Sequence, residues 1–110
     1  GNPHCVVFCE DPSVLDLETL GPQFEHAKYF PDRINTEFVR IVNENTLRMR
    51  VYERGNGETV ACGTGACAAV IAATENGFVE KGKDITVKLI GGDLVVNYTA
   101  VLGYEGVVEY

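Results

Sequence analysis

The sequence lacks any long apolar run and any cluster of basic residues. No apolar run approaches the roughly 20 residues needed to cross a bilayer, and the first residues do not resemble a signal peptide. Its 9 Lys and Arg residues against 16 Asp and Glu residues give a formal net charge of -7. This balance argues against nucleic acid or an anionic membrane surface as a partner and leaves a small polar ligand open.

The spacing of the four cysteines does not suit disulfides or a zinc site. Cys5 and Cys9 lie in a segment typical of a strand, which would hold them about 13 Å apart. Cys62 and Cys67 lie around a predicted helix start, and the sequence contains no C-x-x-C pair of the kind common in zinc sites. We therefore expect free thiols in a reducing cytoplasm, and no metal site.

The remaining composition is typical of one ordinary soluble domain, because 110 residues with 45% hydrophobic and 23% charged side chains can form one core. Strands are expected at residues 4–9, 37–42, 47–53, 84–90, 94–99 and 106–110. The segments 37–42 and 47–53 alternate in polarity, and 43–46 resembles a hairpin turn between them. Another turn is predicted at 91–93.

Helical signals occur in two regions. Asp16 is expected to cap a short helix, and Gly21-Pro22 to open a second helical piece that ends before Pro31. Residues 63–76 are apolar on nearly every side of a helix, so this helix must be enclosed, and Asn76-Gly77 supplies its stop. We predict an α+β fold in which a curved or barrel-like sheet, antiparallel or mixed, wraps around a buried central helix.

The stretch from Glu53 to Cys67 is the most informative, because it leads from a strand to a thiol at the opening of that apolar helix. The small residues after Cys62 allow close approach of a ligand, and the first helical N–H groups have no partner within the helix. These groups and the helix dipole favour an anion, and they favour a thiolate over a thiol. Cys62 is therefore either a reactive base or nucleophile or a small buried thiol in a tight turn.

Four segments resemble diaminopimelate epimerase, namely residues 1–4, 30–39, 47–55 and 57–68. They follow the order of the family, and the last third of the chain fits its strand pattern loosely. Cysteine followed by Gly-Thr-Gly also occurs in the related proline racemases. The preceding Glu-Arg-Gly-x-Gly-Glu-Thr-x-Ala favours diaminopimelate epimerase.

The resemblance implies a cofactor-independent isomerase that converts LL- to meso-2,6-diaminopimelate in lysine biosynthesis. One thiolate would remove the α-proton while a second thiol protonates the opposite face. The family has two homologous halves with one such cysteine each. Residues 1–110 would then be a single, partial C-terminal domain whose N-terminal half is absent, so we expect the chain alone to be inactive. Its expected partners are diaminopimelate and that N-terminal half, and a homodimer is compatible with the sequence.

At the reacting centre, the resemblance makes Cys62 one of the two catalytic cysteines. Gly63 and Thr64 would offer backbone N–H groups to the substrate carboxylate. Glu53 and His4 would lie near the two thiols and modulate their pKa values, with His4 closer to the thiol that this chain lacks. Read without the resemblance, Glu53 is a surface charge and His4 is a satisfied core histidine.

At the distal end of the substrate, Asn2, Asn35 and Arg54 would bind the second polar group, with Glu53 beside them. Arginine suits a carboxylate because its guanidinium presents paired donors. The simpler alternative is that Asn2 and Asn35 are turn residues and that Arg54 is a solvated strand end. From their positions, Cys5 and Cys9 on a predicted strand and Cys67 inside the predicted helix are expected to be packing residues.

Two other functions stay open at this point. A proline or hydroxyproline racemase-like enzyme would not need the polar distal site, and a non-catalytic ligand-binding domain of the same fold would keep only the anion-binding helix start. The Thr-Gly-Pro-Ala segment of the family is missing near the end, where residues 98–104 take its place.

Overall fold

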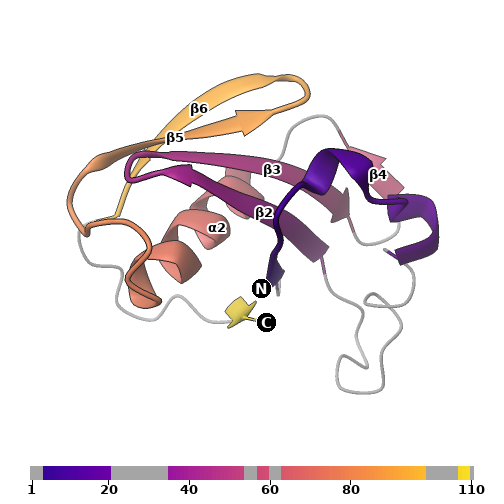
Figure 1. The fold of residues 1–110 in the computed structure, drawn as a ribbon, viewed down its shortest axis with the longest axis horizontal. Coiled ribbons are helices and arrows are strands. Elements are labelled where there is room, and N and C mark those ends of the chain that lie inside the picture. Colours follow the sequence, from indigo (N-terminus) through magenta and orange to yellow (C-terminus); the bar gives the residue numbers. More distant parts are fainter. Residues whose placement is uncertain (1–3, 21–34, 54–56, 60–62, 99–106, 110) are drawn as a thin grey trace.

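The structure is a computed structural model that describes residues 4–20, 35–53, 57–59, 63–98 and 107–109 (Figure 1). Residues 17–20 are helical. The other elements are β1 (His4–Phe8), the 3-10 helix η1 (Pro12–Val14), β2 (Asn35–Asn43), β3 (Thr46–Glu53), β4 (Gly57–Thr59), α2 (Gly63–Glu75), β5 (Asp84–Leu89), β6 (Gly92–Asn97) and β7 (Val107–Glu109).

The described strands form one mixed sheet in the order β6-β5-β3-β2-β1-β7, and β4 pairs with β3. β1 runs parallel to β2 and β7, and β3 runs parallel to β5. The pairs β2–β3, β3–β4 and β5–β6 are antiparallel. Because α2 lies against this mixed sheet (Figure 1), the predicted α+β class is confirmed.

The hairpin of β2 and β3 forms where the sequence predicts it. Its turn is held by the backbone N–H of Asn45, which donates to the side-chain oxygen of Asn43 at 3.0 Å. This local bond is the usual reason for asparagine in turns. Beyond the turn, Leu47, Met49 and Val51 alternate onto one face and are buried. Period-two patterning therefore fixes the register of β3.

The helix α2 is enclosed on several sides, as its composition predicts. Its buried residues are Gly65, Ala66, Ala68, Ala69, Val70, Ala72 and Ala73. The helix ends in a Schellman motif, in which Phe78 N–H donates to Ala73 O at 2.9 Å and Gly77 N–H donates to Thr74 O at 3.0 Å. Gly77 has a φ of 77°, a conformation that disfavours other residues. The predicted stop at Asn76-Gly77 is confirmed.

Apolar side chains cover both faces of the sheet. On one face, α2 packs against residues that include Val6, Val39 and Val51. On the other face, Leu17 packs with Phe38 and Tyr52. The first face is called here the helix-side face.

The turn between β5 and β6 differs from the prediction. It lies at residues 90–91, because Leu89 pairs directly with Gly92, whereas the sequence predicts a turn at residues 91–93. Gly92 already belongs to β6 and has a φ of 134°. Two adjacent glycines permit either turn, and the pairing of the strands decides between them. The helical piece predicted after Gly21-Pro22 lies outside the described residues.

None of the described helices has both the length and the apolar character that crossing a membrane requires.

Candidate functional site

Three of the predicted site residues lie in one row across the sheet. His4 at the start of β1 pairs with Asn35 at the start of β2. In the antiparallel pair of β2 and β3, Thr36 is opposite Tyr52, so the same register places Asn35 opposite Glu53. The structure therefore brings together His4, Asn35 and Glu53, which are distant in sequence.

The row faces the helix. Side chains alternate along a strand, so His4 shares the face of Val6, and Glu53 shares the face of Val51, both of which pack against α2. His4 is fully buried, whereas Asn35 and Glu53 are half-buried. The polar row thus lies at one end of the helix-side face, where the apolar core gives way to partly exposed positions.

The helix α2 opens with two further predicted residues, Gly63 and Thr64, and both are exposed. Within the described part of the chain, a Cβ placed on Gly63 would meet no heavy atom within 4 Å, so there is room beside the helix start. The first N–H groups of a helix lack partners within the helix and favour an anion. This end of α2 therefore carries the partial positive charge of the helix dipole.

Three predicted residues, Asn2, Arg54 and Cys62, lie outside the described residues. In the sequence, Asn2 is two positions before His4, Arg54 directly follows Glu53, and Cys62 directly precedes Gly63. Their roles stay predictions.

Glu37, which the sequence analysis did not single out, forms a buried pair with His4. The Nδ1 atom of His4 lies 2.5 Å from Oε1 of Glu37, and both side chains are essentially fully buried. Burial raises the pKa of Glu37 to about 7; the hydrogen bond and charge of His4 oppose this rise, and the charge of Glu53 adds to it. The signal available in the sequence was a glutamate on the same period-two face as the apolar residues Val39 and Ile41.

The cysteines in the described ranges, Cys5, Cys9 and Cys67, are free thiols. Burial, with a contribution from the charge of Glu37, raises the pKa of Cys5 to about 12. Burial also raises the pKa of Cys9. Since the thiolate is the reactive form of cysteine, Cys5 and Cys9 have the character of packing residues, which agrees with the prediction.

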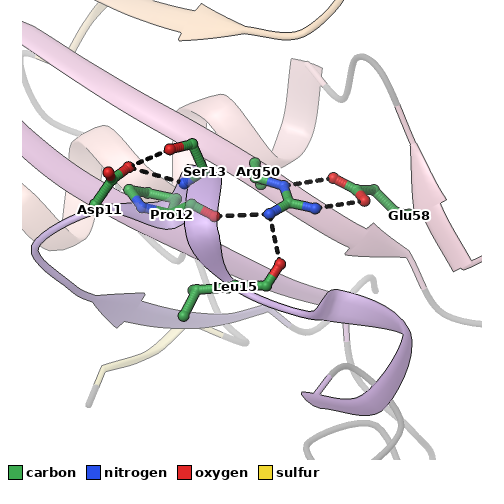
Figure 2. A network of polar contacts seen from close by, with 6 residues as sticks. All are labelled: Asp11, Pro12, Ser13, Leu15, Arg50 and Glu58. Carbon is green, nitrogen blue, oxygen red and sulfur yellow. Dashed lines mark hydrogen bonds and ion pairs between the residues drawn. The ribbon is translucent and has the colours of Figure 1, made fainter.

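The opposite face of the sheet carries a network centred on Arg50, which the sequence analysis also missed (Figure 2). Its guanidinium donates from Nε and Nη2 to the two carboxylate oxygens of Glu58, each at 2.7 Å. Its Nη1 donates to the carbonyl oxygens of Pro12 and Leu15, also at 2.7 Å. We call these four residues the Arg50 clamp.

The Arg50 clamp joins three segments, because Arg50 lies on β3, Glu58 on β4, and Pro12 and Leu15 at the η1 turn. The η1 turn is itself held by Asp11, whose carboxylate accepts from the backbone N–H of Ser13 at 3.0 Å (Figure 2). β4 is followed in sequence by Cys62 and α2. The clamp therefore fixes the strand from which the chain proceeds to the helix start.

Two surface hollows formed by described residues lie away from the polar row. One, of about 440 Å³, lies between the η1 turn and the β5–β6 turn and includes Pro12 and Ile90 in its wall. The other, of about 460 Å³, is lined by residues such as Asn45 and Phe78. Neither hollow includes His4, Asn35 or Glu53 in its wall.

The family model and the curated relatives agree on one family. The family model "Diaminopimelate epimerase" matches residues 1–108. The chain is 56% identical over 99 residues to a diaminopimelate epimerase of Bacillus cereus and 54% identical over 99 residues to that of Bacillus cytotoxicus. Each match covers 90% of this chain and 34% of the relative, so the chain spans about a third of the length of these curated relatives.

A solved structure shows the same fold. It is the crystal structure of the Bacillus anthracis phenazine biosynthesis protein of the PhzF family, which superposes with a TM-score of 0.59 at 24% sequence identity. The match covers 82% of this chain and 28% of that chain. At this identity the likeness concerns the fold alone.

Proposed function

Because the chain belongs to the diaminopimelate epimerase family, we propose that it supplies one half of the active site of an isomerase that converts LL- to meso-2,6-diaminopimelate in lysine biosynthesis. The observation that carries this proposal is the polar row of His4, Asn35 and Glu53 on the helix-side face. Residues from three strands converge there on the side of the sheet that holds α2, whose first residues follow Cys62 in sequence.

In the proposed reaction, Cys62 is one of two thiols that act on opposite faces of the α-carbon, without a cofactor. One thiolate takes the α-proton, and the other thiol delivers a proton to the opposite face. The backbone N–H groups of Gly63 and Thr64 bind the substrate carboxylate, where negative charge develops as the proton leaves. His4 and Glu53 modulate the pKa values of the thiols. Because the thiols must stay reduced, a cytoplasmic location suits this chemistry.

At the distal end of the substrate, Asn2, Asn35 and Arg54 bind the second amino-acid group, with Glu53 beside them. Arg54 offers paired donors for the distal carboxylate. This set is the part of the proposal that distinguishes diaminopimelate from a substrate with one polar end, such as proline.

The test uses a full-length relative in which this chain replaces the matching segment. Cys62→Ala is expected to abolish epimerisation of LL-diaminopimelate, because one of the two proton-transfer groups is lost. Cys67→Ala is the matched control, since it removes a thiol of the same helix and should retain most of the activity. Comparable losses in the two variants would show that the assignment of Cys62 is wrong. Circular dichroism of each variant checks that the fold is kept.

A second experiment addresses the chain by itself. The sequence contains one cysteine at a helix start of this kind, and the proposed reaction needs two. Incubation of the isolated chain with LL-diaminopimelate in D₂O should therefore give no catalytic incorporation of deuterium at the α-carbon with inversion. Formation of deuterated meso product would contradict the two-half mechanism. Exchange without inversion would indicate that a single base acts.

A further inference from the structure

The pair of His4 and Glu37 is an unusual occupant of the core. In register, Glu37 lies between Val6 of β1 and Val51 of β3, and both valines are fully buried. An apolar side chain would fit this position without the loss of hydration that a carboxyl group suffers there. Replacement of a buried charged pair by apolar residues is often neutral or stabilising. Packing therefore does not explain why this position is a glutamate.

The polar atoms of the pair are only partly satisfied. Nδ1 of His4 faces Oε1 of Glu37 at 2.5 Å. Within the described part of the chain, both ring nitrogens of His4 and both carboxylate oxygens of Glu37 are buried without an aligned hydrogen bond, and Nδ1 and Oε1 contact only each other. Buried polar atoms are nearly always paired in folded proteins, and the exceptions are often found at functional sites. His4 thus has one ring nitrogen engaged by Glu37 and the other available.

We propose that Glu37 is a positioning residue that keeps the proton of neutral His4 on Nδ1, so that Nε2 carries the lone pair. An ionised carboxylate only accepts hydrogen bonds, so the nitrogen that faces it must be the donor. The hydrogen bond made by one ring nitrogen determines the state of the other. Two adjacent parallel strands, β1 and β2, hold the two side chains in place.

The consequence for catalysis rests on the proposed function, in which His4 lies near the second thiol. Nε2 with a lone pair can accept the proton of that thiol: the S–H bond breaks, an N–H bond forms, and a thiolate and an imidazolium result. The carboxylate of Glu37 then stabilises the imidazolium through Nδ1–H, which follows the logic of a nucleophile, a base and a group that orients the base. Glu37 does not touch the substrate in this scheme.

The test measures the protonated nitrogen of His4 directly. In the ¹⁵N-labelled chain at pH 8, long-range ¹H–¹⁵N correlation spectra distinguish protonated from unprotonated ring nitrogens. His26 is the other histidine of the sequence, so His26→Gln assigns the signals. We expect His4 to be protonated on Nδ1 and unprotonated on Nε2. A proton on Nε2 in the unaltered chain would overturn the proposal.

Two variants show whether Glu37 is the cause. Glu37→Gln keeps the size of the side chain but has an amide group that can donate to Nδ1, so the form with the proton on Nε2 should increase. Glu37→Leu removes the partner, and should shift the proton in the same direction. If Glu37→Leu fails to fold, Glu37→Gln still decides, and an unchanged His4 spectrum in that variant would refute the role of Glu37.

Thr36→Val is the matched control, because Thr36 is a buried neighbour on the same strand whose side chain lies on the opposite face. This substitution changes one side chain of β2 to another of the same shape, on the face that does not contact His4. The His4 spectrum should be that of the unaltered chain. A shift of the proton in Thr36→Val as large as in Glu37→Gln would mean that any change in β2 moves it, and would overturn the specific role of Glu37.

Kinetics in the full-length chimera separate this inference from the proposed function. Glu37→Gln is expected to lower kcat about tenfold or more, with KM changed less than about twofold, because the pair acts on a thiol and not on substrate binding. Thr36→Val should leave both constants unchanged. Normal kcat in Glu37→Gln would overturn the inference while the epimerase proposal stands. An inactive chimera with the expected His4 proton would overturn the epimerase proposal and support the role of Glu37.

Discussion

The Arg50 clamp should contribute far more to stability than the exposed ion pair on the β5–β6 hairpin. The side chains of Arg50 and Glu58 are 17% and 21% exposed, and the guanidinium makes four hydrogen bonds of 2.7 Å. Lys88 and Asp93 are 44% and 52% exposed, and a single contact of 3.2 Å joins them. The two pairs therefore differ in burial, in number of bonds and in geometry.

The free-energy change for Arg50→Ala can be bounded from these differences. Exposed pairs contribute about 0–1 kcal/mol, whereas breaking a fully buried pair costs about 3–5 kcal/mol because one charge is left unpaired. The clamp is closer to the buried limit, and the carbonyl groups of Pro12 and Leu15 also lose their donor. We expect Arg50→Ala to lower the free energy of unfolding by about 3 kcal/mol, and Tm by about 15 °C at about 5 °C per kcal/mol for a domain of this size.

The measurement is thermal and urea denaturation followed by circular dichroism. Lys88→Ala is the control and should change the free energy of unfolding by less than about 0.5 kcal/mol. Arg50→Lys keeps the charge but not the fork of donors, so it should fall between the two. A double-mutant cycle of Arg50→Ala with Glu58→Ala isolates the pair and should give a coupling above about 1 kcal/mol. A coupling near zero, or equal losses for Arg50→Ala and Lys88→Ala, would refute the reasoning.

Three further predictions concern other residues. The pKa of Glu37 rises from 4.5 to about 7 on folding, so its contribution to stability is present below pH 4.5 and is lost as the pH rises to about 7. The free energy of unfolding of Glu37→Gln, relative to that of the unaltered chain, should therefore increase across this pH range. The opposite slope would contradict the pKa shift. Gly77→Ala should lower the free energy of unfolding by about 1 kcal/mol, because the φ of 77° is strained for alanine; an unchanged urea midpoint would disprove this. Cys5, buried and with a pKa of about 12, should resist iodoacetamide at pH 8 until the chain unfolds; mass spectrometry that finds rapid labelling in the native state would count against its assignment to packing.

The elements that the sequence predicted well are those with local causes. The β2–β3 hairpin follows from period-two alternation and from an asparagine turn, and the end of α2 follows from Gly77. The α+β class and the enclosed helix follow from these patterns and from the apolar surface of α2. The turn between β5 and β6 was predicted at residues 91–93 and lies at 90–91, because its position depends on the pairing of β5 with β6, which is not a local property.

The site was predicted from different information. His4, Asn35 and Glu53 lie together because strands that are far apart in the sequence pair with one another. The resemblance to a family assigned these residues to one site, which their spacing alone could not do. The alternation of β3 placed Arg50 on the face opposite to Met49 and Val51, but it could not show that the η1 turn and Glu58 would cover that face. Interactions that need three segments to meet leave no periodic signal.

Glu37 shows why alternation is an incomplete guide at such a position. The period of two places Glu37 on the helix-side face with Val39, where a charged residue contradicts the apolar pattern. From the sequence of β2 alone, this position suggests only that the strand begins irregularly, because the polar partner of Glu37 is His4 on another strand. A buried charge without a local partner is therefore itself a signal that a second group, distant in sequence, lies against it. Here that second group is the histidine to which the family resemblance independently assigns a role beside a thiol.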